Sequence, residues 1–167
     1  MSAVLDHMLS IPHARAIGMT LVKHDASGSV VRVPYAEHLV GDPDTGVVHG
    51  GVLTALLDNT CGLAVRPPDG EAVSIATLDL RIDYMAPAEP HKDIFAEAIC
   101  YKRTRNIAFV RASAYQDSPA EPIATCVAAF MLGTRGEPRD AGPRDEPGAA
   151  GTRGEPRDLP APGGARP

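Results

Sequence analysis

Hydrophobic and polar residues alternate clearly along one segment of the chain, at 73–84. The alternation has a period of two, which is typical of strands that bury one face. At 73–84 the apolar face would hold Leu78, Leu80, Ile82 and Tyr84, and the opposite face Asp79, Arg81 and Asp83. Further strand-type segments are predicted at 19–25 and 29–35, which Ala26-Ser-Gly28 joins as in a hairpin, and at 94–102, 107–116 and 123–132. The connections between most of them are short, which favours antiparallel neighbours.

One segment between these strands has a helical pattern instead. It runs from about Gly50 to Val65 and stops before Pro67 and Pro68, which cannot continue a helix. Its apolar residues lie on more than one side, as expected of a helix that is buried on most of its surface. We therefore predict an α+β domain in which a curved antiparallel sheet of about six strands wraps one long helix. A short helix is also expected at 3–9.

The composition changes near residue 133. Residues 134–167 contain 7 Gly and 7 Pro, and Leu159 is their only large apolar residue. Such a segment cannot bury enough surface to offset its ordering entropy, so it is predicted to be a disordered tail behind a single domain at 1–133. The tail contains the same seven residues twice, at Thr134–Asp140 and Thr152–Asp158 (TRGEPRD). This duplication indicates a low-complexity extension and not a repeat fold.

The remaining composition narrows the class of protein. The net charge of -5 gives no field to attract nucleic acid, and no stretch approaches the apolar length of a membrane span. Cys61, Cys100 and Cys126 are widely spaced and odd in number, which indicates neither a disulfide framework nor a metal site. The start of the chain does not resemble a secretory signal, so a cytoplasmic protein is expected.

The predicted long helix begins with two adjacent glycines, Gly50 and Gly51. Bare N–H groups at a helix start, reinforced by the helix dipole, stabilise a carbonyl oxygen that gains negative charge, as in an oxyanion hole. Alternatively, the glycines only let the chain turn tightly into the helix. The glycines alone leave both interpretations open.

Asp58 lies in the same apolar helix, where an unpaired carboxylate would be costly to bury. It could hydrogen-bond Thr54 or cap a loop, or it could be a general base or nucleophile, which the helix start upstream favours. Seven residues, or about 10 Å along the helix axis, separate it from Gly51. A catalytic carboxylate must come within about 3 Å of its target. Asp58 is therefore expected to act at the helix start of a second subunit.

The segment Gly46-Val-Val-His49-Gly-Gly, with Asp58 nine residues after the histidine, resembles the signature of PaaI-type hotdog thioesterases. The segments at 78–88 and 104–110 are similar to later parts of the same family, and the resemblance covers about residues 15–133. It implies a hotdog fold, a homodimer that is often paired again into a dimer of dimers, and hydrolysis of acyl- or aryl-CoA thioesters without a metal or redox cofactor. By the same resemblance, the Gly50 amide polarises the thioester carbonyl, Asp58 of the partner chain activates water or attacks directly, and His49 is a positioning residue.

Two positions depart from the family pattern. Relatives often carry Asn or Gln six residues before the histidine, where this chain has Pro43; a one-residue bulge could bring in Asp42, which would then tend to raise the pKa of Asp58. Thr77 matches a Ser or Thr that relatives place beside the carboxylate. Strict alternation puts Thr77 on the charged face of its strand, so a bulge would be needed to bring it there.

Lys102, Arg103 and Arg105 cluster in one predicted turn and are candidates to bind the phosphates of CoA, unless they form only a solvated hairpin tip.

Three other functions compete with hydrolysis. Asp58 argues against a non-catalytic acyl-CoA binding module, because binding alone gains nothing from a buried acid. A hotdog dehydratase usually pairs a histidine with an acid, and His49 has no obvious partner of that kind. A structural or scaffold protein would act through the duplicated motif of the tail at 134–167.

Overall fold

The computed structural model describes residues 11–68 and 74–133. The helix predicted at 3–9 and the disordered tail predicted at 134–167 lie outside these residues. No helix in the described ranges combines the length and the apolar character that a membrane crossing requires.

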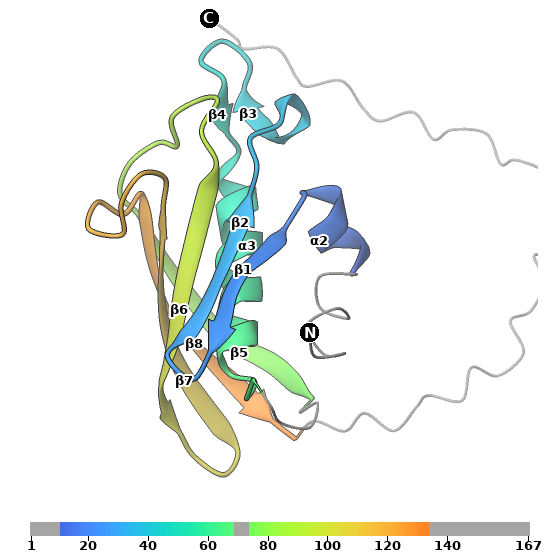
Figure 1. Ribbon diagram of the computed structural model, residues 1–167, viewed down its shortest axis with the longest axis vertical. Coiled ribbons are helices and arrows are strands. Elements are labelled where there is room, and N and C mark those ends of the chain that lie inside the picture. Colours follow the sequence, from blue (N-terminus) through green and yellow to red (C-terminus); the bar gives the residue numbers. More distant parts are fainter. Residues whose placement is uncertain (1–10, 69–73, 134–167) are drawn as a thin grey trace, which may run out of the picture. The chain divides into compact units, whose positions relative to one another are not determined.

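Six antiparallel strands form one curved sheet (Figure 1). In spatial order the strands are β1 (Thr20–Asp25), β2 (Gly28–Val33), β6 (Ile94–Arg103), β7 (Ile107–Tyr115), β8 (Ala124–Leu132) and β5 (Ile75–Tyr84). Each begins and ends within about two residues of the predicted strand. The sheet therefore confirms the predicted antiparallel architecture and leaves β1 and β5 as its two edges.

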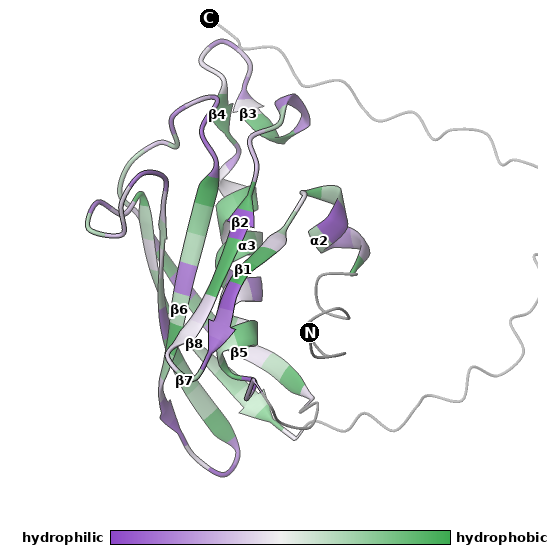
Figure 2. Ribbon diagram, in the orientation of Figure 1, coloured by the Kyte–Doolittle hydropathy of each residue, from purple (hydrophilic) through white to green (hydrophobic). Residues whose placement is uncertain are grey.

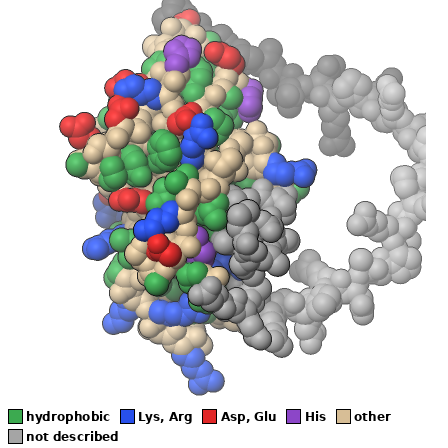
Figure 3. All heavy atoms as spheres, viewed as in Figure 1, with side chains coloured by type: hydrophobic (Ala, Val, Ile, Leu, Met, Phe, Trp, Pro, Cys, Tyr) green, Lys and Arg blue, Asp and Glu red, His purple; other side chains and the backbone are tan. Residues whose placement is uncertain are grey.

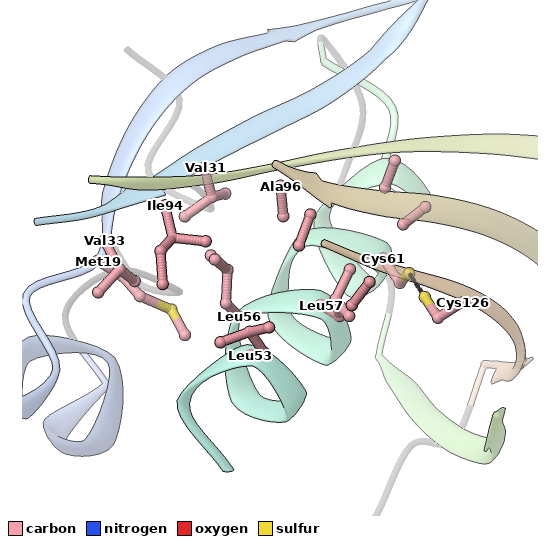
Figure 4. Close-up of a cluster of buried hydrophobic side chains, with 14 of the residues drawn as sticks. Met19, Val31, Val33, Leu53, Leu56, Leu57, Cys61, Ile94, Ala96 and Cys126 are labelled. Atoms are coloured by element: carbon pink, nitrogen blue, oxygen red, sulfur yellow. Dashed lines mark hydrogen bonds between the residues drawn. The ribbon is translucent and has the colours of Figure 1, made fainter. Parts of the chain in front are cut away.

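The helix α3 (Gly50–Ala64) lies along the concave side of this sheet and contacts β2, β6 and β7 most extensively. Leu56, Leu57 and Leu63 on the helix are fully buried. They pack against small and branched side chains of the sheet, and Figure 4 shows Met19, Val33 and Ile94 converging on one end of the helix. Hydrophobic residues predominate along β2 and β6, whereas hydrophilic residues gather in the loops (Figure 2). The hydrophobic core thus lies between α3 and the sheet, as predicted.

Four short elements were not predicted. A helix, α2 (Pro12–Ala16), precedes the sheet, and a 3-10 turn, η1 (Glu37–Leu39), leads into a two-stranded ribbon of β3 (Val40–Asp42) and β4 (Val47–Val48). Elements of two to five residues carry too little periodicity to be recognised from sequence. The ribbon matters for function because it delivers the chain directly to the start of α3.

The regular alternation predicted for β5 is wrong at one position. The register passes from Thr77, opposite Phe130, to Asp79, opposite Ala129, so Leu78 is the extra residue of a β-bulge. Leu78 is 50% exposed instead of sharing a buried face with Leu80. The bulge reverses the phase of the strand and turns Thr77 toward the helix side.

Candidate active site

His49 is the N-cap of α3, and its side chain accepts a hydrogen bond from the second amide of the helix. The backbone N–H of Gly51 donates to Nδ1 of His49 at 2.9 Å. An imidazole nitrogen that accepts a hydrogen bond carries no proton, so neutral His49 bears its proton on Nε2. The β3–β4 ribbon fixes the position of the residue, because the N–H of His49 donates to the Leu39 carbonyl at 2.9 Å.

Two glycines make room for the His49 ring. A Cβ atom on Gly51 would lie 2.8 Å from Nδ1 of His49, and a Cβ atom on Gly41 would lie 2.7 Å from its Cα atom. Real Cβ atoms essentially never make such contacts. A side chain at position 51 would therefore displace the His49 ring, and the Gly51 amide already has an acceptor.

The Gly50 amide, in contrast, has no hydrogen-bond partner in the described part of the chain. The neighbouring peptide group, which joins Gly50 to Gly51, is held at both ends. Its N–H donates to His49, and its carbonyl oxygen accepts from the hydroxyls of Tyr84 at 3.1 Å and Thr54 at 3.2 Å. The free amide at the helix start is thus mounted on a fixed backbone, which is the arrangement an oxyanion hole requires.

Asp58 lies two turns farther along α3 and is half-buried. The hydroxyl of Thr77 donates to its Oδ1 at 2.9 Å, across from the helix to β5. The bulge at Leu78 makes this contact possible, so the structure brings Thr77 beside the carboxylate as the family resemblance implied. The alternative hydrogen bond to Thr54 is not formed, because the Thr54 hydroxyl lies 2.6 Å from that of Tyr84.

Asp42, the alternative to the missing polar residue at Pro43, is engaged within its own loop. Its carboxylate accepts from the Thr45 hydroxyl at 2.7 Å and from the Asp44 amide at 3.1 Å, within its own turn. The hydrogen bond from Thr45, followed by the one from Asp44, lowers the pKa of Asp42. This carboxylate serves to close the loop between β3 and β4.

A cavity of about 370 Å³ opens beside the helix start. Gly50 and Tyr84 line it together with apolar side chains that include Val48, Leu53 and Met85. The Tyr84 ring is 53% exposed and lies 3.6 Å from the position that a Cβ on Gly50 would occupy. An apolar group bound in this cavity would lie directly beside the free Gly50 amide.

The cations predicted to bind phosphate separate into two kinds. Arg103 is anchored: its Nη1 donates to the Val65 carbonyl at the end of α3, at 2.6 Å. Lys102 and Arg105 are exposed at the β6–β7 hairpin and have no partner in the described ranges. The three side chains therefore do not converge through any interaction with one another.

Cys61 on α3 and Cys126 on β8 are free thiols whose Sγ atoms lie 3.6 Å apart (Figure 4). The hydrogen bond with Cys126, together with burial, raises the pKa of Cys61. This keeps the thiol protonated and poorly nucleophilic. Among the described residues, no cluster of three or more His, Cys, Asp or Glu side chains is arranged to hold a metal ion.

The fold and the start of α3 together define a class of protein. A helix wrapped by an antiparallel sheet, with a free glycine amide at its start and a carboxylate along its length, is the frame of a hotdog thioesterase. Residues 45–123 match the family model of the thioesterase superfamily. This chain belongs to that superfamily and has the hotdog fold.

Two solved structures illustrate the likeness. A protein from Pseudomonas aeruginosa is 47% identical, with a TM-score of 0.68; the match covers 77% of this chain and 98% of that one. A mutant of the phenylacetic acid degradation protein PaaI from Thermus thermophilus is 22% identical, with a TM-score of 0.63, and the match covers 72% and 98% of the two chains. At that identity, the second likeness shows the fold alone.

Two curated proteins are similar in sequence. The medium/long-chain acyl-CoA thioesterase YigI of Escherichia coli is 24% identical over 136 residues, which are 74% of this chain and 86% of YigI. A Halobacterium salinarum protein named as an inferred esterase is 42% identical over 71 residues, which are 41% of this chain. This second match spans only 46% of the Halobacterium protein.

Sequence reasoning missed two residues of the helix start. Tyr84 and Thr54 hold the Gly50 carbonyl, yet an aromatic residue at the end of an alternating strand is ordinarily assigned to the core. The available signal was the alternation itself, which places Tyr84 on the same face as Leu80 and Ile82, toward the helix.

Proposed function

We propose that the protein hydrolyses acyl-CoA thioesters to the free acid and CoA, with a site formed by two subunits. The observation that carries the proposal is the pairing of an unengaged Gly50 amide with a carboxylate, Asp58, oriented by Thr77. Superfamily membership supports the reaction class, and the name of YigI supports an acyl-CoA substrate.

The two catalytic groups are too far apart to act within one chain. Eight residues separate Gly50 from Asp58, or about 12 Å along the helix axis. The side of α3 that the sheet leaves open has mostly small residues: Gly51, Thr54, Ala55 and Asp58. Small side chains let a second helix approach closely. When two such helices pair antiparallel about a point between Thr54 and Ala55, each Asp58 faces the partner's helix start.

The edge strand β5 supports the same pairing. Leu78, Tyr84 and Met85 are apolar or aromatic and are 50%, 53% and 60% exposed on or just after this strand. An exposed edge with such side chains is a template for pairing with another strand. A dimer joined through β5 and α3 would cover both surfaces at once, and a further pairing of dimers is consistent with the family resemblance.

In this site, the thioester carbonyl oxygen accepts from the Gly50 N–H of one subunit. Asp58 of the partner subunit removes a proton from water as that water attacks the carbonyl carbon, or attacks the carbon itself. In both routes the C–S bond then breaks, and the CoA thiolate leaves and takes up a proton. After direct attack, water hydrolyses the remaining acyl-aspartate anhydride to the free acid and restores Asp58. The apolar cavity beside Gly50 holds the acyl group, which favours unsubstituted aliphatic or aryl chains over charged ones.

The test is thiol release from a panel of acyl- and aryl-CoA thioesters by the wild type and by Asp58→Ala. We expect turnover by the wild type and a loss of several orders of magnitude in kcat in the variant, with unchanged circular dichroism and an unchanged dimer in size-exclusion chromatography. Equal activity of the two proteins would refute the role of Asp58. Tight binding of CoA thioesters without any turnover by the wild type would instead identify a binding module.

A further inference from the structure

A second cavity, of about 250 Å³, lies at the opposite end of α3 from Gly50. It is formed where the end of the helix meets the β1–β2 turn and the last residues of β6. Arg66 and Arg103 both line it, together with Ser27 and Gly28. Neither Arg66 nor this cavity takes part in the hydrolysis described above.

Arg66 is the unusual residue of this cavity. Its Nε atom is buried and has no hydrogen-bond partner, and no carboxylate in the described ranges forms an ion pair with it. Burial lowers the pKa of the Arg66 guanidinium. A guanidinium nevertheless stays charged at neutral pH, so this position holds a partly desolvated cation that has no counter-ion among the residues that the structure describes. A bound anion would satisfy both its charge and its unused donor.

Arg103 supplies a second, fixed cation. The hydrogen bond from its Nη1 to the Val65 carbonyl holds the guanidinium beside the residue that precedes Arg66. The other N–H groups of Arg103 remain available, and the planar fork of a guanidinium matches the oxygens of a phosphate. Figure 3 shows Lys and Arg side chains gathered at the end of the molecule that carries the β6–β7 hairpin.

One acidic residue also lines the cavity. The Asp25 carboxylate accepts from the Ser27 amide at 2.7 Å and from the Ser27 hydroxyl at 2.5 Å, and it lies 3.2 Å from Nζ of Lys23. The hydrogen bonds from Ser27 hold the pKa of Asp25 at about 2. Its negative charge is thus already paired with Lys23, and the two arginines leave the cavity with a net positive charge.

We propose that Arg66 and Arg103 bind phosphate groups of the CoA substrate. This inference rests on the proposed hydrolysis of CoA thioesters, because in such a substrate the pantetheine arm separates the phosphates from the reacting sulfur. A phosphate site must therefore be remote from the reacting carbonyl. Arg66 follows the end of α3 at Ala64, which is itself about 9 Å along the helix axis from Asp58. Lys102 and Arg105, which are solvent-exposed, contribute only a screened field at this site.

The experiment compares two substrates that differ only in the nucleotide. Steady-state kinetics are measured with the same acyl group carried on CoA and on pantetheine, for the wild type, Arg66→Gln and the surface control Arg105→Gln. We expect Arg66→Gln to raise KM for acyl-CoA by about tenfold or more, as for the loss of a charged hydrogen bond. KM for acyl-pantetheine and kcat for both substrates should not change, and Arg105→Gln should resemble the wild type.

Each other outcome overturns the assignment. An equal change in KM for both substrates in Arg66→Gln would indicate a structural role of Arg66. A rise in KM of the same size in Arg105→Gln would indicate a diffuse positive electrostatic field and not a phosphate site. If the wild type cleaves no thioester, calorimetric binding of CoA and of pantetheine tests the site separately: the site stands only if CoA binds more tightly and Arg66→Gln abolishes the difference. Competition by inorganic phosphate without a preference for CoA over pantetheine would assign the site to a free phosphate and refute the substrate role.

Discussion

The hydroxyl of Thr77 lies 2.9 Å from Oδ1 of Asp58 and donates a hydrogen bond to it, although the two residues come from different layers of the fold. Asp58 is on α3, and Thr77 is on β5 just before the bulged residue Leu78. The hydrogen bond fixes one carboxylate oxygen, and Oδ2 has no hydrogen-bond donor among residues 11–68 and 74–133. A carboxylate held in this way is oriented for a proton transfer with one oxygen only.

Removal of the Thr77 hydroxyl should therefore impair the proposed reaction without unfolding the protein. Thr77→Val keeps the shape of the side chain and removes the donor, so we expect kcat to fall by about tenfold to a hundredfold, with little change in KM. Thr77→Ser retains the donor and should keep most of the activity. The variants are compared by thiol-release kinetics; a Thr77→Val enzyme as fast as Thr77→Ser would show that the hydrogen bond does not orient Asp58.

The Gly50 amide can be deleted without removing the helix that carries it. Gly50 is the first residue of α3, a position that tolerates proline, and His49 has φ -61° and ψ 133°, which a residue before proline adopts readily. Gly50→Pro removes the N–H donor, and we expect kcat to fall by about a hundredfold to a thousandfold, as for the loss of one oxyanion-hole donor.

Gly50→Ala is the matched control for this variant. It keeps the N–H, and its Cβ would lie 3.6 Å from the Tyr84 ring, an ordinary contact. Circular dichroism should show the same helix content in both proteins, with near-normal turnover only in Gly50→Ala. Comparable kcat values in Gly50→Pro and Gly50→Ala would rule out the Gly50 amide as the oxyanion donor.

Tyr84 is expected to position the helix start through the Gly50 carbonyl. Tyr84→Phe removes the hydroxyl that lies 3.1 Å from this oxygen and 2.6 Å from the Thr54 hydroxyl. We expect a several-fold lower kcat and a loss of about 1 kcal/mol in the free energy of unfolding. Tyr101→Phe is the control, since Tyr101 is 55% exposed, close to the 53% of Tyr84, and has no hydrogen-bond partner in the described part of the chain. Identical kinetics in the two variants would leave Tyr84 without a positioning role.

The sequence predicted the main architecture because the strong signals are local. Alternation in the strands, the Gly50–Gly51 start and the Pro67–Pro68 stop each depend on neighbouring residues, and the corresponding elements lie where they were expected. The bulge at Leu78 is different, because it results from pairing with β8, about fifty residues away in the chain. Periodicity within β5 alone could not reveal it.

The candidate site was predictable only in part for the same reason. Asp58 and the helix-start glycines are recognisable by their types and spacing. The acceptor role of His49 toward Gly51 was not recognisable, because histidine is not among the residues favoured as helix N-caps. The unpaired Nε of Arg66 depends on how the end of α3 meets β1, β2 and β6, which no local pattern encodes.

The half-buried His24 should make the stability of the fold depend on pH. Its Nδ1 lies 2.8 Å from the Ser29 hydroxyl, and burial lowers its pKa while the nearby Asp25 opposes the shift. The unfolded chain therefore binds a proton more readily than the folded one as the pH falls below the unfolded value of about 6.5. The contribution of His24 to stability is present above that value and is lost progressively below it.

This contribution can be isolated by comparing the wild type with His24→Gln, which cannot be protonated. The free energy of unfolding is measured by urea denaturation between about pH 8 and about pH 5. We expect the wild type to be the more stable protein at the upper end and the difference between the two to shrink toward the lower end, because protonation disfavours the folded state of the wild type alone. A difference that stays constant or widens as the pH falls would mean that folding does not disfavour the charged form of His24.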